Sequence, residues 1–416
     1  MPWSAASPST ASPSTARREP PKILIFEPEA EGHTLEWLDA IVRLAVSEGT
    51  GAELWLVVAE GLCGPLARLL PGSSRDRIRI VPLPAREARR CIGRPLARAG
   101  FWRWWTMRKY LSKTGAQHGL FLSIDLLTLP LALGLGAHGK ALSGVLFRPS
   151  VHYREIGPYR PTIGDRLRDL QKAVLYPLML RNRAVERILT LDPFFPVYAR
   201  TYYRHGDKVS ALPEPCPPEA KPTANDNEGD FVPAGRTGFL LFGYLAERKG
   251  PLAVLDALRL LPPEVTSRIA ILFAGKVDPS LRPRLEQRRQ ALMQERPDLW
   301  LRIDDRRLER SELAALVRRS DVVLAPYQKF VGSSGVLMWA AVNGRPVLAQ
   351  DFGLVGRLTR EHRLGVSVDS CDPAQLASEI AHMVERGPAT FIDLPAAARF
   401  VATQTPQRFA SVVLSV

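Results

Sequence analysis

Residues 320–351 read SDVVLAPYQKFVGSSGVLMWAAVNGRPVLAQD, and this stretch decides the predicted fold. The apolar run at residues 322–324 predicts a strand that is buried on both faces. Residues 336–342 are apolar on every side, which predicts a buried helix that ends near Gly344. A second strand begins at residues 346–348. Strand, loop, helix and strand in this order predict a parallel α/β sheet.

The loop between that strand and that helix reads Gly332-Ser333-Ser334-Gly335. Small residues at a helix N-terminus leave backbone N–H groups accessible, and these donors and the helix dipole attract phosphate. An ordinary tight turn, in which Gly and Ser serve only to cap the helix, explains the same residues. The loop is therefore a predicted phosphate-binding loop, with the capping turn as the alternative.

Short apolar runs of the same kind recur throughout the 416 residues, which suffice for two domains. Strands are predicted at 22–26, 54–58, 79–82, 120–124, 144–147, 188–191, 239–242, 269–273, 300–303, 322–324, 346–348 and 366–368. Helical patterns lie between them, so we predict an α/β protein with two Rossmann-like, doubly wound domains facing a cleft. The predicted boundaries are 1–20 (disordered tail), 21–211 (N-terminal domain), 212–236 (linker), 237–388 (C-terminal domain) and 389–416 (a tail that packs back on the N-terminal domain).

The composition restricts the partners. A net charge of +14 and a pI near 10 favour anionic partners such as nucleic acid, acidic lipid or a phosphorylated substrate. The four cysteines are scattered without metal-ligand spacing, which indicates a reducing compartment and no disulfide framework. No apolar run reaches the ~20 residues that a membrane-spanning helix needs. We therefore expect a cytoplasmic protein.

Two histidines follow predicted strands of the first half. Gly32 and His33 lie where the first strand gives way to a helix that begins at Thr34, and His152 lies just past the strand at 144–147. Ligands of open α/β sheets gather at such strand ends. A His that only bonds the backbone is the alternative for both positions. The three-glycine dinucleotide fingerprint is missing, so the sequence does not predict NAD binding.

The first strand of the second half runs into Gly243-Tyr244-Leu245-Ala246-Glu247-Arg248-Lys249-Gly250. Arg248 and Lys249 place positive charge where the next helix begins. A cation there opposes the helix dipole, and an anionic ligand would relieve this conflict. The prediction is a diphosphate site built on Lys249 and Arg248, with a solvated Arg–Lys pair as the alternative.

Residues 84–113 hold nine Lys or Arg against one acid, Glu87, around the run Phe101-Trp102-Arg103-Trp104-Trp105. A basic, aromatic, helix-compatible stretch is a candidate for contact with an anionic membrane surface. The alternatives are a core position for the tryptophans and nucleic-acid binding, for which no motif is present. Farther along, residues 166–187 predict an amphipathic helix with leucines among basic residues.

The C-terminal motifs together resemble the retaining glycosyltransferases called family 4 or group 1. The resemblance covers residues 237–385 and is carried by GYLAERKG, ILFAGK, SELAALVRRSDVVLAPY, GSSGVLMWAAVNGRPVLA and LGVSVD followed by DPAQLASEI. The N-terminal domain matches more weakly, through Gly32-His33 and His152. The resemblance implies the GT-B fold, with an acceptor domain followed by a nucleotide-sugar domain.

Carried over to this sequence, the family pattern matches in part. Lys249 stands at the position of the family's diphosphate-binding Lys, while Tyr244 replaces the Arg and Arg248 is the substitute cation. Of the family's two glutamates, the second position holds Trp339 and the first holds Val331. The family therefore implies Lys249, His152 and His33 as catalytic residues. The implied donor-binding residues are Gly32, Gly243, Tyr244, Arg248, Gly332, Ser333, Ser334 and Gly335.

The resemblance further implies transfer of a sugar from a nucleotide-sugar to a glycan or lipid-linked acceptor. It also implies that the transfer retains the anomeric configuration and needs no cofactor or metal. No nucleic-acid partner is expected beyond the nucleotide of the donor. A non-catalytic nucleotide-sugar-binding protein and a membrane-surface interaction protein of the same fold are the alternatives. An enzyme location on the inner face of the membrane would accord with residues 84–113.

Overall fold

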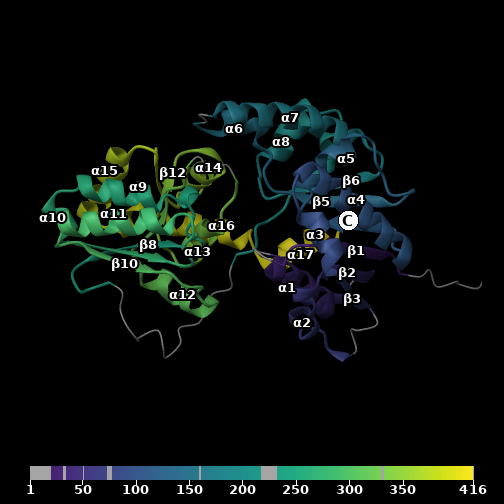
Figure 1. The fold of residues 1–416 in the computed structure, drawn as a ribbon, viewed down its shortest axis with the longest axis horizontal. Coiled ribbons are helices and arrows are strands. Elements are labelled where there is room, and N and C mark those ends of the chain that lie inside the picture. Colours follow the sequence, from purple (N-terminus) through teal and green to yellow (C-terminus); the bar gives the residue numbers. More distant parts are fainter. Residues whose placement is uncertain are drawn as a thin grey trace, which may run out of the picture.

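The computed structural model describes residues 20–30, 34–49, 51–72, 77–158, 161–216, 232–328 and 332–415. Two α/β domains lie next to each other, the N-terminal one from purple to teal and the C-terminal one from green to yellow (Figure 1). Each is built on a parallel sheet with helices on both faces. The predicted fold class, two Rossmann-like doubly wound domains, is confirmed.

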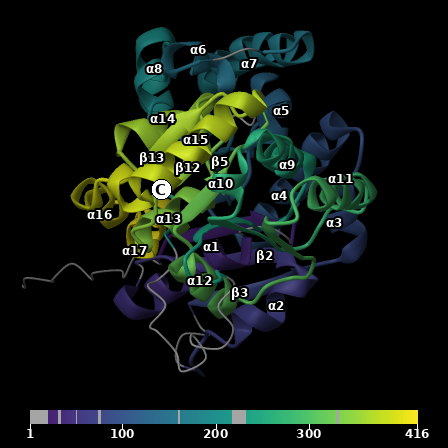
Figure 2. The ribbon, with the colours of Figure 1, turned by 90° about the vertical axis from the view of Figure 1, so that its left-hand side faces the viewer.

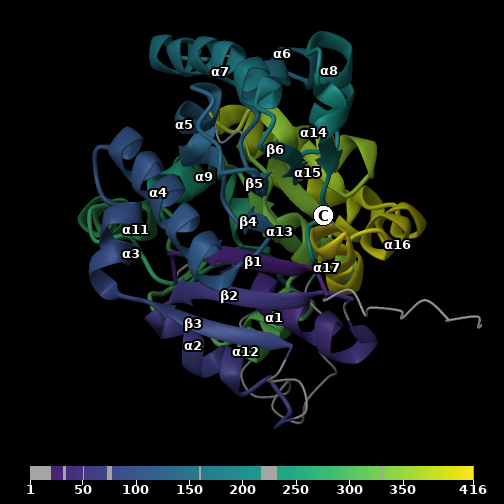
Figure 3. The same cartoon turned by 90° about the vertical axis from the view of Figure 1, so that its right-hand side faces the viewer.

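The N-terminal sheet has seven strands in the order β3-β2-β1-β4-β5-β6-β7 (Figure 3). They are β1 (Lys22–Glu27), β2 (Glu53–Ala59), β3 (Ile78–Leu83), β4 (His118–Phe121), β5 (Ala141–Leu146), β6 (Val185–Thr190) and β7 (Val209–Ala211). β1 pairs in parallel with both β2 and β4 and is therefore central. β7 was not predicted, because three residues at the sheet edge with one buried side chain give no apolar run.

Helices cover both faces of this sheet. They are α1 (Thr34–Leu44), α2 (Glu60–Ala67), α3 (Ala85–Ile92), α4 (Leu96–Thr114), α5 (Thr128–Ala132), α6 (Tyr153–Ile156), α7 (Ile163–Arg181) and α8 (Phe195–Tyr202). Alternate residues of β1 face opposite sides: Ile23 and Ile25 pack with α1 and α2, whereas Leu24 and Phe26 pack with α4 and α8. This alternation follows from the two-residue period of a strand.

The C-terminal sheet has six strands in the order β10-β9-β8-β11-β12-β13. Figure 2 shows the C-terminal domain from its outer side, with β12 and β13 labelled. They are β8 (Thr237–Phe242), β9 (Ile269–Ala274), β10 (Trp300–Asp304), β11 (Val322–Ala325), β12 (Val347–Gln350) and β13 (Gly365–Val368). The helices are α9 (Pro251–Leu260), α10 (Pro263–Thr266), α11 (Arg282–Glu295), α12 (Arg310–Arg319), α13 (Gly335–Val342), α14 (Gly353–Glu361) and α15 (Pro373–Arg386). The predicted apolar helix α13 is confirmed and is buried between sheet and neighbours.

The chain ends with two helices that join different domains. α16 (Leu394–Ala402) packs against α13 of the C-terminal domain, and α17 (Pro406–Leu414) packs against α1 of the N-terminal domain. The Phe409 ring lies 4.9 Å from the Trp37 ring, centroid to centroid, inside the core of the N-terminal domain. Most of the segment between the domains, residues 217–231, lies outside the described residues.

The predicted helix at 166–187 was too long at its C-terminal end. α7 begins at Ile163 behind a capping box formed by Thr162 and Asp165, and it ends at Arg181. Asn182 terminates it, because its amide donates to the carbonyl oxygens of Leu131 and Leu135 and its Oδ1 accepts from the backbone of Ala184. These long-range contacts leave no trace in the local apolar pattern.

Among the described helices, none has both the length and the apolar character required to traverse a lipid bilayer.

Candidate functional site

A cleft of about 1060 Å³ separates the two domains. The N-terminal domain lines it with residues at the carboxyl ends of β1 and β5, and the C-terminal domain with the end of β8 and the first turn of α13. Ligands of parallel α/β sheets bind at these strand ends, so the cleft is the candidate site.

Lys249 is the central cation of the C-terminal wall. It ends the short 3₁₀ turn Glu247–Lys249 and is 9% exposed. Its Nζ donates to the Tyr327 hydroxyl at 2.8 Å, and this hydroxyl lies 2.7 Å from Ser334 Oγ. Ser334 in turn caps α13 by accepting from the backbone of Val336. The ammonium group therefore faces Tyr327 and the loop residue Ser334 and not bulk water.

Two glycines hold this lysine turn in place. Gly243 has φ 99°, and a Cβ there would lie 3.7 Å from Lys249 Nζ. Gly250 has φ 79°, and a Cβ there would lie 2.0 Å from the carbonyl oxygen of Pro326. Only glycine adopts this backbone and this close approach without strain. The turn thus packs directly against the end of β11, next to Tyr327.

Cations from both domains converge on the cleft. Arg248 comes from the C-terminal wall and Arg148 from the loop after β5. Partial burial lowers the pKa of Arg248, and the positive charge of Arg148 lowers it further. Two like charges that approach each other across a cleft repel and raise the electrostatic energy, and an anion bound between them would lower it.

The N-terminal wall carries acids. Glu27 ends β1 and is 3% exposed, and its Oε1 accepts from the backbone N–H of Glu29 at 2.9 Å. Burial raises the pKa of Glu27 to about 7, against the opposing effect of the Arg103 charge. Arg103 of α4 is itself buried, where it donates to the Cys91 carbonyl and pairs with Glu29. Glu27 is therefore poised to gain or lose a proton near neutral pH.

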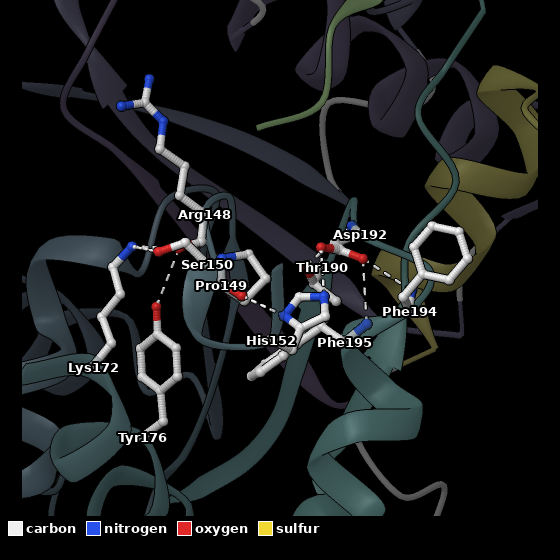
Figure 4. A network of polar contacts seen from close by, with 10 residues as sticks. All are labelled: Arg148, Pro149, Ser150, His152, Lys172, Tyr176, Thr190, Asp192, Phe194 and Phe195. Atoms are coloured by element: carbon white, nitrogen blue, oxygen red, sulfur yellow. Dashed lines mark hydrogen bonds and ion pairs between the residues drawn. The ribbon is translucent and has the colours of Figure 1, made fainter. Parts of the chain in front are cut away.

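His152 lies in a buried polar network beside the cleft (Figure 4). Its Nδ1 donates to the Pro149 carbonyl at 2.7 Å, and its Nε2 lies 3.1 Å from Asp192 Oδ2. The Asp192 Oδ1 accepts from the backbone of Phe194 and Phe195. His152 is not among the lining residues, so its predicted contact with a sugar stays a prediction, and its observed contacts fix the loop that carries Arg148.

The remaining predicted residues divide into three groups. Gly332, Ser333, Ser334, Gly335, Gly243 and Tyr244 line the cleft together. The Tyr244 hydroxyl donates to Asp278 Oδ2 at 3.0 Å. Gly32, His33 and Val331 lie outside the described residues. Trp339, at the position of a family glutamate, lines the cleft and packs edge-on against Phe242, with ring centroids 6.4 Å apart.

Sequence reasoning gave no role to Glu27 and Arg148, which line the cleft, or to Tyr327, which is buried against Lys249. Arg148 directly follows the strand that precedes His152, and its place at a strand end was a usable signal. Tyr327 carried no such signal, because its contact with Lys249 joins positions 78 residues apart. The described residues contain no group of three or more His, Cys, Asp or Glu side chains arranged to hold a metal ion.

The basic and aromatic stretch at 84–113 is divided between core and surface. Trp104 donates to the Gly136 carbonyl at 3.0 Å, and Arg90 and Arg108 stack on Trp102 and Trp104. Trp105 alone of the three tryptophans is exposed, at 55%. Contact of this stretch with a membrane stays a prediction, and its exposed large apolar residues are Ile92, Leu96 and Trp105.

Comparison with known proteins identifies the class of the C-terminal domain. Residues 236–386 match the family model described as Glycosyl transferases group 1, which confirms the resemblance seen in the sequence. Residues 236–386 therefore form a domain that matches the group 1 glycosyltransferase family, and the two-domain architecture of the chain is that of the GT-B fold. A search of curated protein sequences found no match.

Solved structures share the fold over almost the whole chain. WaaG, a glycosyltransferase involved in lipopolysaccharide biosynthesis, is 15% identical with a TM-score of 0.63, covering 94% of this chain and 99% of its own. HepE from Anabaena, in complex with UDP and glucose, is 14% identical with a TM-score of 0.60, covering 95% and 97%. Sucrose-phosphate synthase from Thermosynechococcus elongatus is 16% identical with a TM-score of 0.66, covering 94% and 96%. At these identities the likeness concerns the fold alone.

Proposed function

We propose that this protein transfers a sugar from a nucleotide-sugar donor to a glycan or lipid-linked acceptor. The observation that carries the proposal is Lys249, buried in the cleft wall and linked through Tyr327 to the first turn of α13. A cation and a helix N-terminus directed at one point form a seat for a diphosphate. The UDP and glucose bound to HepE, a protein of the same fold, accord with such a donor.

In the proposed reaction the donor bond between the anomeric carbon and the diphosphate oxygen breaks, and a bond from that carbon to the acceptor oxygen forms. The acceptor proton passes to the leaving phosphate, so charge and atoms balance without a redox partner. Lys249, Arg248 and Arg148 stabilise the negative charge that develops on the leaving group. Because the leaving diphosphate can direct the acceptor to the same face of the sugar, retention needs no protein nucleophile, and the three cations take the place of a metal.

The nucleoside is proposed to lie near Trp339. The indole replaces a carboxylate that would bond ribose hydroxyls, and it lines the cleft beside Gly335. An aromatic face contributes packing with a base or ribose, not an ionic hydrogen bond. The same substitution favours a second candidate function, a protein that binds the nucleotide-sugar without turnover.

The proposed setting is the cytoplasm. All four cysteines are free thiols, which suits a reducing compartment, and the basic charge suits an anionic membrane face near a lipid-linked acceptor.

A panel of nucleotide-sugars tests the proposal. Donor binding raises the thermal midpoint of the full chain, because a ligand that binds only the folded state stabilises it. Slow release of free nucleoside diphosphate from the same donor establishes the enzyme, and a midpoint shift without release establishes the binding protein. If no donor on a panel of uridine, guanosine, adenosine and cytidine sugars shifts the midpoint, the proposed function is wrong.

A further inference from the structure

Helix α7 exposes its apolar side. Five of its apolar residues follow one another at intervals of four, three, four and four positions, which places these five on one helix face. All are solvent-exposed: Ile163 (79%), Leu167 (63%), Leu170 (63%), Val174 (53%) and Leu178 (39%). In all three ribbon views α7 lies along the upper outer edge of the molecule (Figures 1 to 3). Contiguous exposed apolar surface marks an interaction site.

The opposite face of α7 is tied to the protein by polar contacts. Asp169 accepts from Ser150 Oγ at 2.6 Å, and Lys172 Nζ donates to the Arg148 carbonyl at 2.7 Å and to Ser150 Oγ at 2.9 Å. Near the C-terminal end Tyr176 is buried in the core. Rotating the helix to bury its leucines would break these contacts. The outward direction of the apolar stripe, defined as Ile163, Leu167, Leu170, Val174 and Leu178, is therefore fixed by the fold.

The charges beside the stripe have one sign. Arg166, Arg168 and Arg181 are exposed, and no acidic side chain of α7, which the structure describes throughout, is exposed. Asp165 is half-buried, accepts a hydrogen bond from the Thr162 hydroxyl and forms an ion pair with Arg168. The surface of α7 thus combines an apolar stripe with cationic flanks.

The charge pattern and the sequence select the occupant. A second copy of the chain would bring cationic flanks against cationic flanks, in a protein with a net charge of +14. Residues 1–19 and 217–231 contain only scattered large apolar residues, so neither segment supplies a complementary apolar run. An anionic lipid surface offers both an acyl region for the stripe and phosphates for the arginines.

We propose that α7 docks this protein on an anionic lipid surface. The helix, roughly 28 Å long at 1.5 Å per residue, lies in the plane of the interface. Its leucines enter the boundary between headgroups and acyl chains, and its arginines remain among the phosphates. The same helix holds the Arg148 loop through Lys172, so the docked face and the cleft share a structural element. The proposal concerns binding alone and is independent of the proposed sugar transfer.

Vesicle flotation of the full chain tests the proposal. We expect the wild type to float with vesicles of phosphatidylcholine and phosphatidylglycerol and to remain unbound with phosphatidylcholine alone. Leu167→Gln/Leu170→Gln should lower partitioning at least tenfold. Because both leucines are 63% exposed, the variant should fold normally, as circular dichroism melting would confirm. Arg166→Gln/Arg181→Gln should lower partitioning by about fivefold per arginine, and added salt should weaken wild-type binding.

Two control variants make the test specific. Leu260→Gln/Leu394→Gln removes leucines of similar exposure, 58% and 56%, from the C-terminal domain and should leave flotation unchanged. Leu96→Gln/Trp105→Gln removes the exposed apolar residues of α4. It distinguishes membrane binding through α7 from membrane binding through residues 84–113.

Four outcomes would overturn the proposal. They are equal flotation of wild type and Leu167→Gln/Leu170→Gln, equal wild-type binding to neutral and anionic vesicles, and loss of flotation only in the α4 variant. The fourth is a wild-type dimer, detected by light scattering, that the α7 variant abolishes while vesicle binding is absent.

Discussion

The two walls of the cleft have opposite chemistry. The C-terminal wall presents Arg248, Lys249, Arg307 and Arg310, whereas the N-terminal wall presents Glu27, Glu29 and Glu36. The exceptions are Arg148, a cation of the N-terminal wall, and Glu309, an acid of the C-terminal wall. A diphosphate donor suits the cationic wall, and a hydroxyl-bearing acceptor, which donates hydrogen bonds to carboxylates, suits the acidic one. The contrast is the charge distribution that the proposed function would need to hold a donor and an acceptor on opposite walls.

The walls also differ in how they support their central side chain. Lys249 is buried but has a hydroxyl partner in Tyr327. Glu27 is buried with one backbone donor and a nearby guanidinium, and burial still dominates its pKa. The surroundings of Lys249 therefore stabilise a charged ammonium group, whereas the surroundings of Glu27 favour the neutral carboxylic acid. Four experiments can break or sharpen this contrast.

Loss of the central cation should have the largest effect. Lys249→Ala removes a preorganised charge from the leaving group, which lowers kcat at least tenfold and typically by ~10²–10³. Steady-state kinetics on the donor found in the panel measures this loss. Lys276→Ala, whose side chain is 54% exposed in the same domain, is the control and should keep full activity. Equal rates for Lys249→Ala and the wild type, with both proteins folded, would refute the cationic seat.

Glu27 should make stability depend on pH. Its folded pKa of about 7 exceeds its usual 4.5, so the folded state holds the proton more tightly than the unfolded state. The stabilisation is complete below about pH 4.5 and is lost as the pH rises to about 7. The loss amounts to about 3 kcal/mol for the shift quoted. Glu27→Gln, which keeps a neutral side chain of the same shape, should therefore be more stable than wild type at pH 8 and similar at pH 5.

Denaturant unfolding at pH 5 and pH 8, monitored by tryptophan fluorescence, measures this difference. Glu60→Gln, an exposed carboxylate of the same domain, is the control and should shift neither value. If the difference in unfolding free energy between Glu27→Gln and wild type is the same at both pH values, Glu27 does not have a raised pKa in the folded protein.

The exceptional cation of the acidic wall should contribute to donor affinity. Arg148→Gln removes one charge-assisted contact to the diphosphate, worth about 1.5–3 kcal/mol, and should weaken donor binding by roughly tenfold to 100-fold. Calorimetric titration with the donor measures the loss, and Arg154→Gln, an exposed arginine on α6, is the control. If Arg148 and Arg248 grip the same anion, their double variant will lose less than the sum of the single losses. If Arg148→Gln binds the donor with unchanged affinity, the diphosphate is bound by the C-terminal wall alone.

The smallest effect is expected at the hydroxyl that links the two parts of the cationic wall. Tyr327→Phe removes the bonds to Lys249 and Ser334 but keeps the ring, at a cost of about 1 kcal/mol. We expect a several-fold fall in kcat and a small drop in the thermal midpoint. Ser334→Ala should resemble it if the chain of hydroxyls acts as a unit. A Tyr327→Phe enzyme as slow as Lys249→Ala would mean that the hydroxyl itself takes part in the chemistry.

Most of the fold was predictable because a strand buried on both faces consists of a local run of apolar residues, which is visible in the sequence. All twelve predicted strands are present with shifted ends, and the missing one, β7, is a three-residue edge strand. The helix start at Ser334 and Gly335 and the turn at Lys249 were also predictable, since glycine and serine at a helix start have a characteristic backbone geometry. Phosphate binding at these positions stays a prediction. Residues 217–231, Gly32 and His33 lie outside the described residues.

The sequence by itself determined two parallel sheets, a buried helix α13 and a cationic turn at Lys249, because each depends on residues close together in the chain. Only the tertiary structure decided that Arg148 reaches the cleft and that Tyr327 links Lys249 to Ser334. It also turned the apolar side of α7 outward and buried Arg103 of α4, two features that composition and helical period leave open. The physical reason is that these contacts join positions far apart in sequence, and their free energy depends on burial and distance that no local pattern encodes.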